Sequence, residues 1–415
     1  MNETPAPALP SPQRLMSLDA LRGFDMFWII GADSLVYALN RMAHGGAQNA
    51  PGFSVTGFLA YELDHADWEG FHFYDLIFPL FVFMAGISLV FSLTKTIQRE
   101  GRKAAVKRVF RRGILLFLLA LFYSGGFSNP WPDMRLMGVL NRIALCYFFA
   151  GLMFCFCGLR AMIAIAVSLL AAYWALLTFV PIRNIQLEKP KLEELARQRG
   201  VPFDPKALFY ATTDRVTAHY GHGFNLSDHL DFQYLPGRKY DTYFDPEGFL
   251  STLPAIVTCL LGVFAGLFLL NPSFNDQQKV ISLLAGGLVL VSLGWAWSAQ
   301  FPVIKKIWTS SYVLVAGGYS AALLALFYWI VDVCKWQRWC QPFVWMGMNS
   351  ITVYLTANML GGFRSLGRRL VGGDIRDFFN DRLAGSGDLV LSIVGLFLAF
   401  AFVRFLYRRK IFLRL

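Results

Sequence analysis

The chain has 415 residues, of which 56% are hydrophobic and only 16% are charged, and its formal net charge is +11. Soluble domains carry about 25% charged residues, so this composition excludes an ordinary soluble protein. Lys and Arg gather beside the ends of apolar runs, as in the cytoplasmic loops of membrane proteins, and the positive charge therefore does not indicate a nucleic-acid partner.

Ten apolar runs predict ten transmembrane helices, since about 20 apolar residues cross a hydrocarbon core roughly 30 Å thick. We therefore expect an all-α fold, a polytopic membrane bundle, in a single transmembrane domain at 15–415. Residues 1–14, rich in Pro and Ala, are expected to be a flexible tail, with no removable signal peptide. The expected spans are residues 21–42, 74–97, 110–127, 136–157, 160–181, 249–270, 279–298, 309–332, 341–362 and 388–408.

The orientation of the chain follows from its basic residues. A dense run of Lys and Arg lies between positions 95 and 112, and cytoplasmic loops carry such an excess. An even number of spans then places both termini in the cytoplasm and the long segments 43–73 and 182–248 outside. Lys305, Lys306 and the arginines between 364 and 382 oppose this orientation, but the run at 95–112 is denser.

The histidines and cysteines are distributed unevenly along this topology. All six histidines fall in the two exterior segments. Loops tolerate histidine and lipid does not, which explains most of them, yet any imidazole chemistry would have to occur at the outer face. The six cysteines lie in expected spans or in cytoplasmic segments, so no disulfide framework is expected.

The first expected span contains two carboxylates, Asp25 and Asp33. Ionisable side chains at membrane depth cost a few kcal/mol and usually face a cavity or a partner. For Asp25 we favour a buried ion pair, for example with Arg142 of the fourth span. For Asp33 an ion pair and a place in a functional cavity both remain open.

The stretch "LDHADWEGFHFYDLIFPLF" runs from a polar segment directly into the second span. His65 lies among acidic residues there, and an imidazole can act as a general base or as a nucleophile. Trp68 could exclude water from it, and Asp75 sits just inside the span, where a carboxylate is costly. His72 is read as an ordinary loop or interfacial histidine.

Three later motifs carry polar groups into or next to spans. Arg135 and Arg142 share one helix face, which suits either phosphate or carboxylate recognition or the neutralisation of a buried acid. "FDPEGFL" predicts a helix start with Asp245 as N-cap. Asn349, in "GMNSITVYLTAN", is expected to hydrogen-bond between helices. No metal site and no familiar nucleotide-binding motif is predicted.

Taken in order, "SLDALRGFDM", "HADWEGFHFYDLIFPLFVFMAGISL", "MRLMGVLNRIALCYF", "YFDPEGFL", "KKIWTSSYV" and "GMNSITVYL" resemble motifs of the heparan-α-glucosaminide N-acetyltransferase family of transmembrane acetyltransferases. The resemblance runs from about Leu15 to the C-terminus. It implies that acetyl-CoA is taken from the cytoplasmic side and that the amino group of a terminal glucosamine is acetylated on the far side.

The resemblance also implies roles for particular residues. The family's active histidine lies in an H-x-x-W-x-G motif, here His65, Trp68 and Gly70. Asp33 stands where the animal enzyme has an active-site asparagine, and it could act as a base or orient His65. Substrate binding is expected at Trp68, Asp75, Asn349 and Arg142. The phosphates of CoA would meet cations on the inner side, for which Arg108, Arg111, Arg112 and Lys410 are available.

The sequence also bears on the location of the protein and leaves two other functions open. The animal enzyme has an additional N-terminal luminal region and one further span, so a bacterial cytoplasmic-membrane protein is expected. A homodimer is compatible with the sequence. A proton-coupled transporter fits the intramembrane acids, although paired repeats with broken helices are not visible in the sequence. An O-acyltransferase of an envelope glycan would share the chemistry but use a different acceptor atom.

Overall fold

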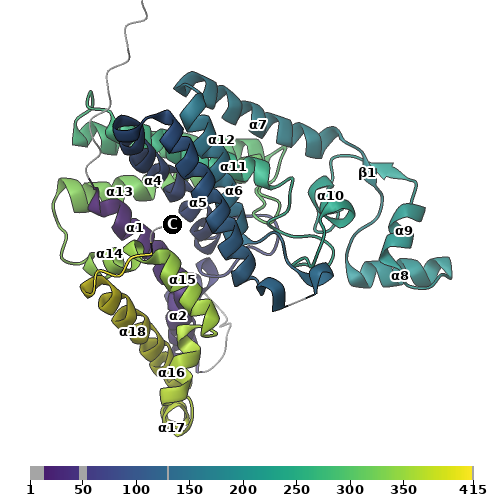
Figure 1. Cartoon of the computed structure of the whole chain (residues 1–415). Helices are drawn as coiled ribbons and strands as arrows, with labels where there is room; N and C mark the ends of the chain where they lie inside the picture. The colour runs from purple at the N-terminus through teal and green to yellow at the C-terminus, as the bar shows by residue number, and fades with distance from the viewer. Residues whose placement is uncertain (1–13, 46–53, 129, 414–415) are drawn as a thin grey trace, which may run out of the picture.

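The computed structural model describes residues 14–45, 54–128 and 130–413. The expected flexible tail therefore lies outside the described residues, apart from Arg14. Long helices pack side by side and a smaller, irregular region projects from one end of them (Figure 1). The all-α class is confirmed, because the described strands are two-residue pieces, β1 (Ile182–Arg183) and β2 (Arg215–Val216).

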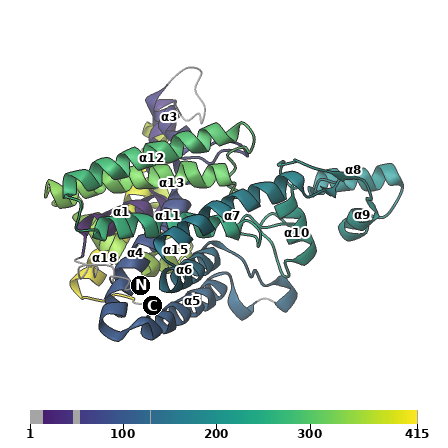
Figure 2. The ribbon, with the colours of Figure 1, turned by 90° about the horizontal axis from the view of Figure 1, so that it is seen from above.

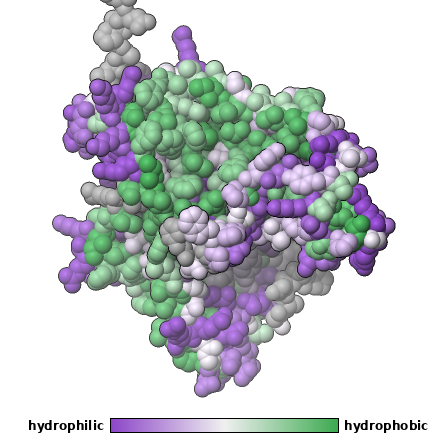
Figure 3. All heavy atoms as spheres, turned by 45° about the vertical axis from the view of Figure 1, so that its right-hand side comes forward, coloured by the Kyte–Doolittle hydropathy of each residue, from purple (hydrophilic) through white to green (hydrophobic). Residues whose placement is uncertain are grey.

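Seven helices of the described chain are long and apolar enough to cross a membrane, and each coincides with an expected span. They are built by α4 (Ile77–Glu100) with the 3₁₀ turn Phe73–Leu76 before it, α6 (Val139–Phe156), α7 (Leu159–Phe179), α11 (Thr252–Leu270), α12 (Asp276–Ser298), α13 (Ser310–Phe327) with the π-helical turn Tyr328–Val333, and α18 (Ser386–Arg408). The chain is a multi-pass membrane protein. Hydrophobic side chains cover a broad face of these helices, while hydrophilic residues gather at the projecting ends (Figure 3).

The other three expected spans have features that shorten or interrupt an apolar helix. Span 110–127 belongs to α5 (Arg102–Tyr123), whose first turns are strongly basic. Span 21–42 is split into α1 (Met16–Phe27) and α2 (Asp33–Ala43) by a π-helical turn, Trp28–Ala32. Gly31 makes this break, because its φ of 112° is readily adopted only by glycine. Span 341–362 is divided at Asn349 into α14 (Gln341–Met348) and α15 (Ser350–Met359).

The interrupted helices α1 and α14 pack closely against each other. A side chain at Gly23 would place its Cβ 1.7 Å from the carbonyl oxygen of Phe343, and one at Gly347 would lie 1.9 Å from that of Asp19. Small residues permit this approach of two backbones, as at many helix contacts in membranes. The sequence did not reveal that two broken helices meet.

The described parts of the two long segments between spans carry short helices. Segment 182–248 contains α8 (Lys189–Arg199), α9 (Pro205–Ala211) and α10 (Leu226–Tyr234), and it has a small core of its own. In both views α8 and α9 project beyond the bundle, and α3 (Val55–Glu62) projects separately (Figure 2). Two short helices, α16 (Phe363–Val371) and α17 (Asp374–Arg382), precede α18.

Candidate active site

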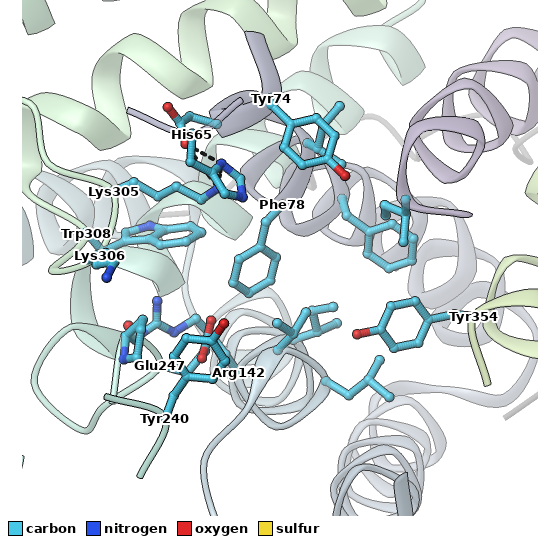
Figure 4. Close-up of a pocket in the computed structure, with 18 of the residues that line it drawn as sticks. His65, Tyr74, Phe78, Arg142, Tyr240, Glu247, Lys305, Lys306, Trp308 and Tyr354 are labelled. Carbon is cyan, nitrogen blue, oxygen red and sulfur yellow. Dashed lines mark hydrogen bonds and ion pairs between the residues drawn. The ribbon is translucent and has the colours of Figure 1, made fainter. Parts of the chain in front are cut away.

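A cavity of about 580 Å³ extends from the segment around His65 into the helical bundle (Figure 4). One part of its wall is polar and aromatic, and the rest is apolar. The polar and aromatic lining residues are His65, Trp68, Tyr74, Asp75, Arg135, Arg142, Tyr240, Glu247, Lys305, Lys306, Trp308, Ser350 and Tyr354. The apolar part is formed by α1, α4, α6 and α15, so the cavity joins the mouth to the interior of the bundle.

His65 is oriented by Asp75. The Nδ1 atom of His65 lies 2.8 Å from Oδ1 of Asp75. Oδ2 of Asp75 accepts hydrogen bonds from the backbone N–H groups of Ala66 and His72, both at 3.1 Å. The Tyr312 hydroxyl donates to the Asp75 carbonyl oxygen at 2.7 Å. The carboxylate is almost fully buried and held by these hydrogen bonds, so it sets the orientation of the imidazole ring.

Lys305 completes this group from a distant part of the chain. Its Nζ atom lies 3.1 Å from Oδ1 of Asp75 and 3.0 Å from Nδ1 of His65. A carboxylate only accepts hydrogen bonds and an ammonium only donates them. All three groups are satisfied when His65 Nδ1–H and Lys305 both donate to Asp75. This tautomer leaves Nε2 of His65 unprotonated and facing the cavity.

Burial and a neighbouring charge act in opposite directions on the pKa of Lys305. Removal from water lowers the pKa of the Lys305 amine, and the neighbouring Asp75 carboxylate opposes this shift. The net direction is downward. An ammonium held in this way loses its proton at a lower pH than a solvated lysine, which makes it sensitive to the alkaline range.

The H-x-x-W-x-G motif is held in place by contacts with segments far along the chain. Trp68 lines the cavity, and its Nε1–H donates to the carbonyl oxygen of Tyr220 at 2.8 Å. Gly70 has a φ of 127°, and its N–H donates to the carbonyl oxygen of Val303 at 2.9 Å. The positive φ explains the glycine in the motif. The second contact brings the loop of His65 against the loop that carries Lys305.

A second polar group lies elsewhere on the cavity wall. Arg135 forms two hydrogen bonds with Asp245, at 2.9 and 2.8 Å, and a third with Glu247 at 2.8 Å. Burial raises the pKa of Glu247 to about 7, although the positive charge of Arg142 opposes the shift. This group places both a carboxyl and guanidinium groups within reach of a bound ligand.

Two expectations about these residues are wrong. Arg142 does not pair with Asp25. It donates to the carbonyl oxygen of Pro246 at 2.7 Å and to Ser251, and it stacks on Trp308 at 4.9 Å, whereas the Asp25 carboxylate has no hydrogen bond among the described residues. "FDPEGFL" does not begin a helix, because α11 starts at Thr252. Residues 245–248 instead form a turn that presents Glu247 to the cavity.

Asp33 and Asn349 lie beside the cavity rather than among the residues that line it. Asp33 begins α2 directly after the helix break and interacts with Tyr74, whose ring centre lies 4.9 Å from that of His65. Asn349, which separates α14 from α15, donates to the carbonyl oxygen of Trp345 in α14 at 3.3 Å. Its neighbour Ser350 lines the cavity instead.

The four cations expected to bind CoA are not among the described residues that line the cavity. Arg108 donates to the Thr96 hydroxyl at 3.1 Å. Arg111 and Lys410 are exposed, and Arg112 turns inward to stack on Tyr147 at 4.7 Å. Within the described residues, no cluster of His, Cys, Asp and Glu is arranged to hold a metal ion.

The sequence reasoning missed Lys305, Lys306, Tyr240 and Glu247 as cavity residues. The two lysines were used only as evidence against the orientation. The motif "KKIWTSSYV" was visible in the sequence, and it places both lysines directly before a span that also supplies Tyr312.

Two curated proteins of known name align with most of the chain. Heparan-alpha-glucosaminide N-acetyltransferase of Mus musculus is 26% identical over 382 residues, which cover 84% of this chain and 56% of that protein. The Homo sapiens protein of the same name is 26% identical over 439 residues, which cover 97% and 60%. The chain is a distant relative of these enzymes. It spans less than two thirds of their length, and no protein-family model matches it. The resemblance inferred from the motifs is thereby confirmed.

Proposed function

We propose that the chain is a transmembrane N-acetyltransferase of the bacterial cytoplasmic membrane, which moves acetyl from cytoplasmic acetyl-CoA to the amino group of a glucosamine-type sugar at the outer face. The observation that carries the proposal is the hydrogen-bonded group of His65, Asp75 and Lys305 at a cavity that enters the bundle. The distant relationship to named N-acetyltransferases supports the same reaction class.

The chemistry requires a base at the acceptor nitrogen. The ammonium of an amino sugar must lose a proton before its nitrogen can attack the acetyl carbon, and Nε2 of His65 is placed to accept it. The C–N bond then forms, the C–S bond of the thioester breaks, and the CoA thiolate is protonated. Alternatively, Nε2 first accepts the acetyl group and then passes it to the amine. Asp75 orients the imidazole in both routes.

Lys305 would stabilise the charge that develops on the acetyl oxygen. Its Nζ atom lies 3.5 Å from Nε2 of His65. When Nε2, or an amine that Nε2 has deprotonated, attacks the acetyl carbon, the carbonyl oxygen comes close to the ammonium. Donors arranged in advance around such an oxygen commonly give the largest catalytic effect.

The acceptor sugar would occupy the polar part of the cavity. Glu247, Tyr240 and Lys306 offer hydrogen-bonding groups for hydroxyls, and Trp68 and Trp308 offer aromatic surfaces. The apolar part, bounded by Phe78, Phe81 and helices α6 and α15, suits the uncharged arm of the thioester. Asp33 is proposed to support His65 through Tyr74.

Purified protein assayed with acetyl-CoA and glucosamine, and in parallel with muropeptides, tests the function. We expect acetylated glucosamine and free CoA from wild type, with a loss of about 10²-fold or more in His65→Ala. His72→Ala is the matched control, because the side chain of His72 contacts the Asp64 carbonyl oxygen and the Tyr61 ring outside the cavity. Acetylation of muropeptide hydroxyls alone would support the O-acyltransferase instead.

A transporter remains the second candidate because of the two broken helices. Substrate sites of transporters are often formed where discontinuous helices meet, and α1–α2 and α14–α15 are both interrupted beside the cavity. Proteoliposomes loaded with buffer and supplied with radiolabelled glucosamine distinguish the two. Uptake without acetylation would replace the acetyltransferase proposal.

A further inference from the structure

The inner end of the cavity is closed by a group of polar side chains that the proposed chemistry does not use. Met26 of α1, Phe81 of α4 and Ile143 of α6 are the last cavity-lining residues along their helices in the direction away from His65. One or two turns further in that direction lie Arg22 and Ser88, with Tyr147 on the third helix. These side chains lie directly beneath the cavity.

Arg22 holds this floor together. It donates to the Ser88 hydroxyl at 2.7 Å and to the carbonyl oxygen of Gly347 at 3.3 Å, so one guanidinium links α1, α4 and α14. These bonds use neutral acceptors. The nearest carboxylate, Asp19, lies at 3.6 Å and is held more closely by Arg14, at 2.7 Å.

Arg112 brings a second guanidinium to the same depth. It stacks on Tyr147 at 4.7 Å, and its charge interacts with that of Arg22. The buried Nε atom of Arg112 and the hydroxyl of Tyr147 have no hydrogen-bond partner among the described residues. Buried donors are normally satisfied, so two unpaired donors beside two like charges indicate a missing anionic acceptor.

We infer that Arg22 and Arg112 form a phosphate-binding site at the inner end of the cavity and that it holds the diphosphate of the CoA donor. The identity of the ligand rests on the proposed function, while the preference for a phosphate rests on the two guanidinium groups. Asp75 and Ser88 are 13 positions apart on one helical stretch, hence about 20 Å. A donor with a long flexible arm between its thioester and its phosphates can therefore place one at each end.

The site also suggests how the donor enters. A phosphate that binds Arg22 competes with Ser88 and the Gly347 carbonyl for the same N–H groups. Binding would thus loosen the link among α1, α4 and α14 and open the floor to the arm. The close contact of Gly347 with α1 makes this junction narrow.

The test measures equilibrium binding of CoA itself to purified protein in nanodiscs of neutral lipid, so that it does not depend on catalysis. Charge-assisted hydrogen bonds to phosphate predict a rise in Kd of about 10- to 100-fold in Arg22→Leu and in Arg112→Leu. Arg22→Lys should lose less, because it keeps the charge. Lys107→Leu, an exposed cation on the same helix as Arg112, is the control and should bind as wild type does.

Arg112→Leu keeps the test decisive if Arg22→Leu fails to fold, since Arg112 does not link three helices. Inorganic diphosphate should compete with CoA in wild type, whereas pantetheine, which lacks phosphate, should bind equally to wild type and Arg112→Leu. Unchanged CoA affinity in folded Arg112→Leu would overturn the site even if acetyl transfer is observed. CoA binding that depends on Arg112 without acetyl transfer would support the site and refute the proposed function. In a second set of nanodiscs that contain phosphatidylglycerol, displacement of this lipid, but not of CoA, by diphosphate would assign the site to a lipid headgroup and overturn the inference.

Discussion

Replacing Asp75 by Asn tests whether this carboxylate sets the protonation pattern of the site. In the native protein, Oδ1 accepts hydrogen bonds from His65 and Lys305, and Oδ2 accepts hydrogen bonds from two backbone N–H groups. An amide has one acceptor oxygen and one donor nitrogen. If its oxygen faces the two backbone groups, its nitrogen must face His65 and Lys305, both of which need an acceptor.

The size of the effect follows from this conflict. With an amide N–H directed at it, Nδ1 of His65 must become the acceptor, and its proton moves to Nε2, the atom proposed to act as base. In serine proteases the wrong histidine tautomer caused by an Asp-to-Asn change lowers kcat by about 10⁴. We expect a loss of about 10³- to 10⁴-fold in kcat for Asp75→Asn, with the KM for the donor little changed.

The assay follows release of the CoA thiol with glucosamine as acceptor, at several pH values and alongside a thermal unfolding measurement. Asp64→Asn is the control, because the Asp64 side chain accepts the backbone N–H of His65, at 2.8 Å, on the exposed side of the loop and does not contact the imidazole. A folded Asp75→Asn protein that keeps more than a tenth of wild-type kcat would refute the tautomer argument and leave Asp75 as a structural residue.

Three other changes test separate parts of the structure. Lys305→Met should lower kcat by about 10²- to 10³-fold. Because burial lowers the pKa of Lys305 from its usual 10.5, wild-type activity should fall at alkaline pH as this ammonium loses its proton. The same alkaline fall in the variant would contradict that assignment. Asp33→Asn should keep the fold and donor binding but change kcat or its pH profile, and no change in either would exclude proton transfer by Asp33. Gly23→Ala should lower the free energy of unfolding by about 1–3 kcal/mol, because its Cβ would lie 1.7 Å from the Phe343 carbonyl oxygen; Gly286→Ala, which meets nothing within 4 Å, should not.

Seven spans could be predicted from the sequence because length and hydropathy act locally. A run of 18 or more apolar residues has few alternatives to a helix in the membrane. The breaks at Gly31 and Asn349 could not be predicted in the same way. Both lie within apolar runs, and what stabilises them is the packing of α1 against α14, which involves residues more than 300 positions apart.

The site was predictable where its residues are neighbours in sequence. His65, Trp68 and Asp75 lie within eleven residues of one another, so their proximity follows from chain length alone, although the contact of Asp75 with His65 was not predicted. Lys305 is 240 positions from His65, and its charge was interpreted only as a sign of topology. Arg111 and Arg112 differ by one position, yet one is exposed and the other turns inward. The rotation of α5 about its axis, relative to the neighbouring helices, decides which arginine faces inward, and this rotation cannot be read from the sequence alone.

The orientation of the bundle can be tested with a cysteine that the chain already has. Cys334 is exposed, whereas four of the other five cysteines are buried and Cys157 is partly so. The basic run at 95–112 predicts that Cys334 lies in the cytoplasm. A membrane-impermeant thiol reagent should therefore fail to label wild type in intact cells and should label it after permeabilisation.

In a Cys334→Ser background, new cysteines at two exposed lysines provide the matched pair. Lys191→Cys, on α8, should react in intact cells, and Lys103→Cys, on α5, should react only once the membrane is opened. The opposite pattern would place His65 and the mouth of the cavity in the cytoplasm. Donor and acceptor would then meet on one side, and the reason for a cavity that extends into the bundle toward two half-buried arginines would disappear.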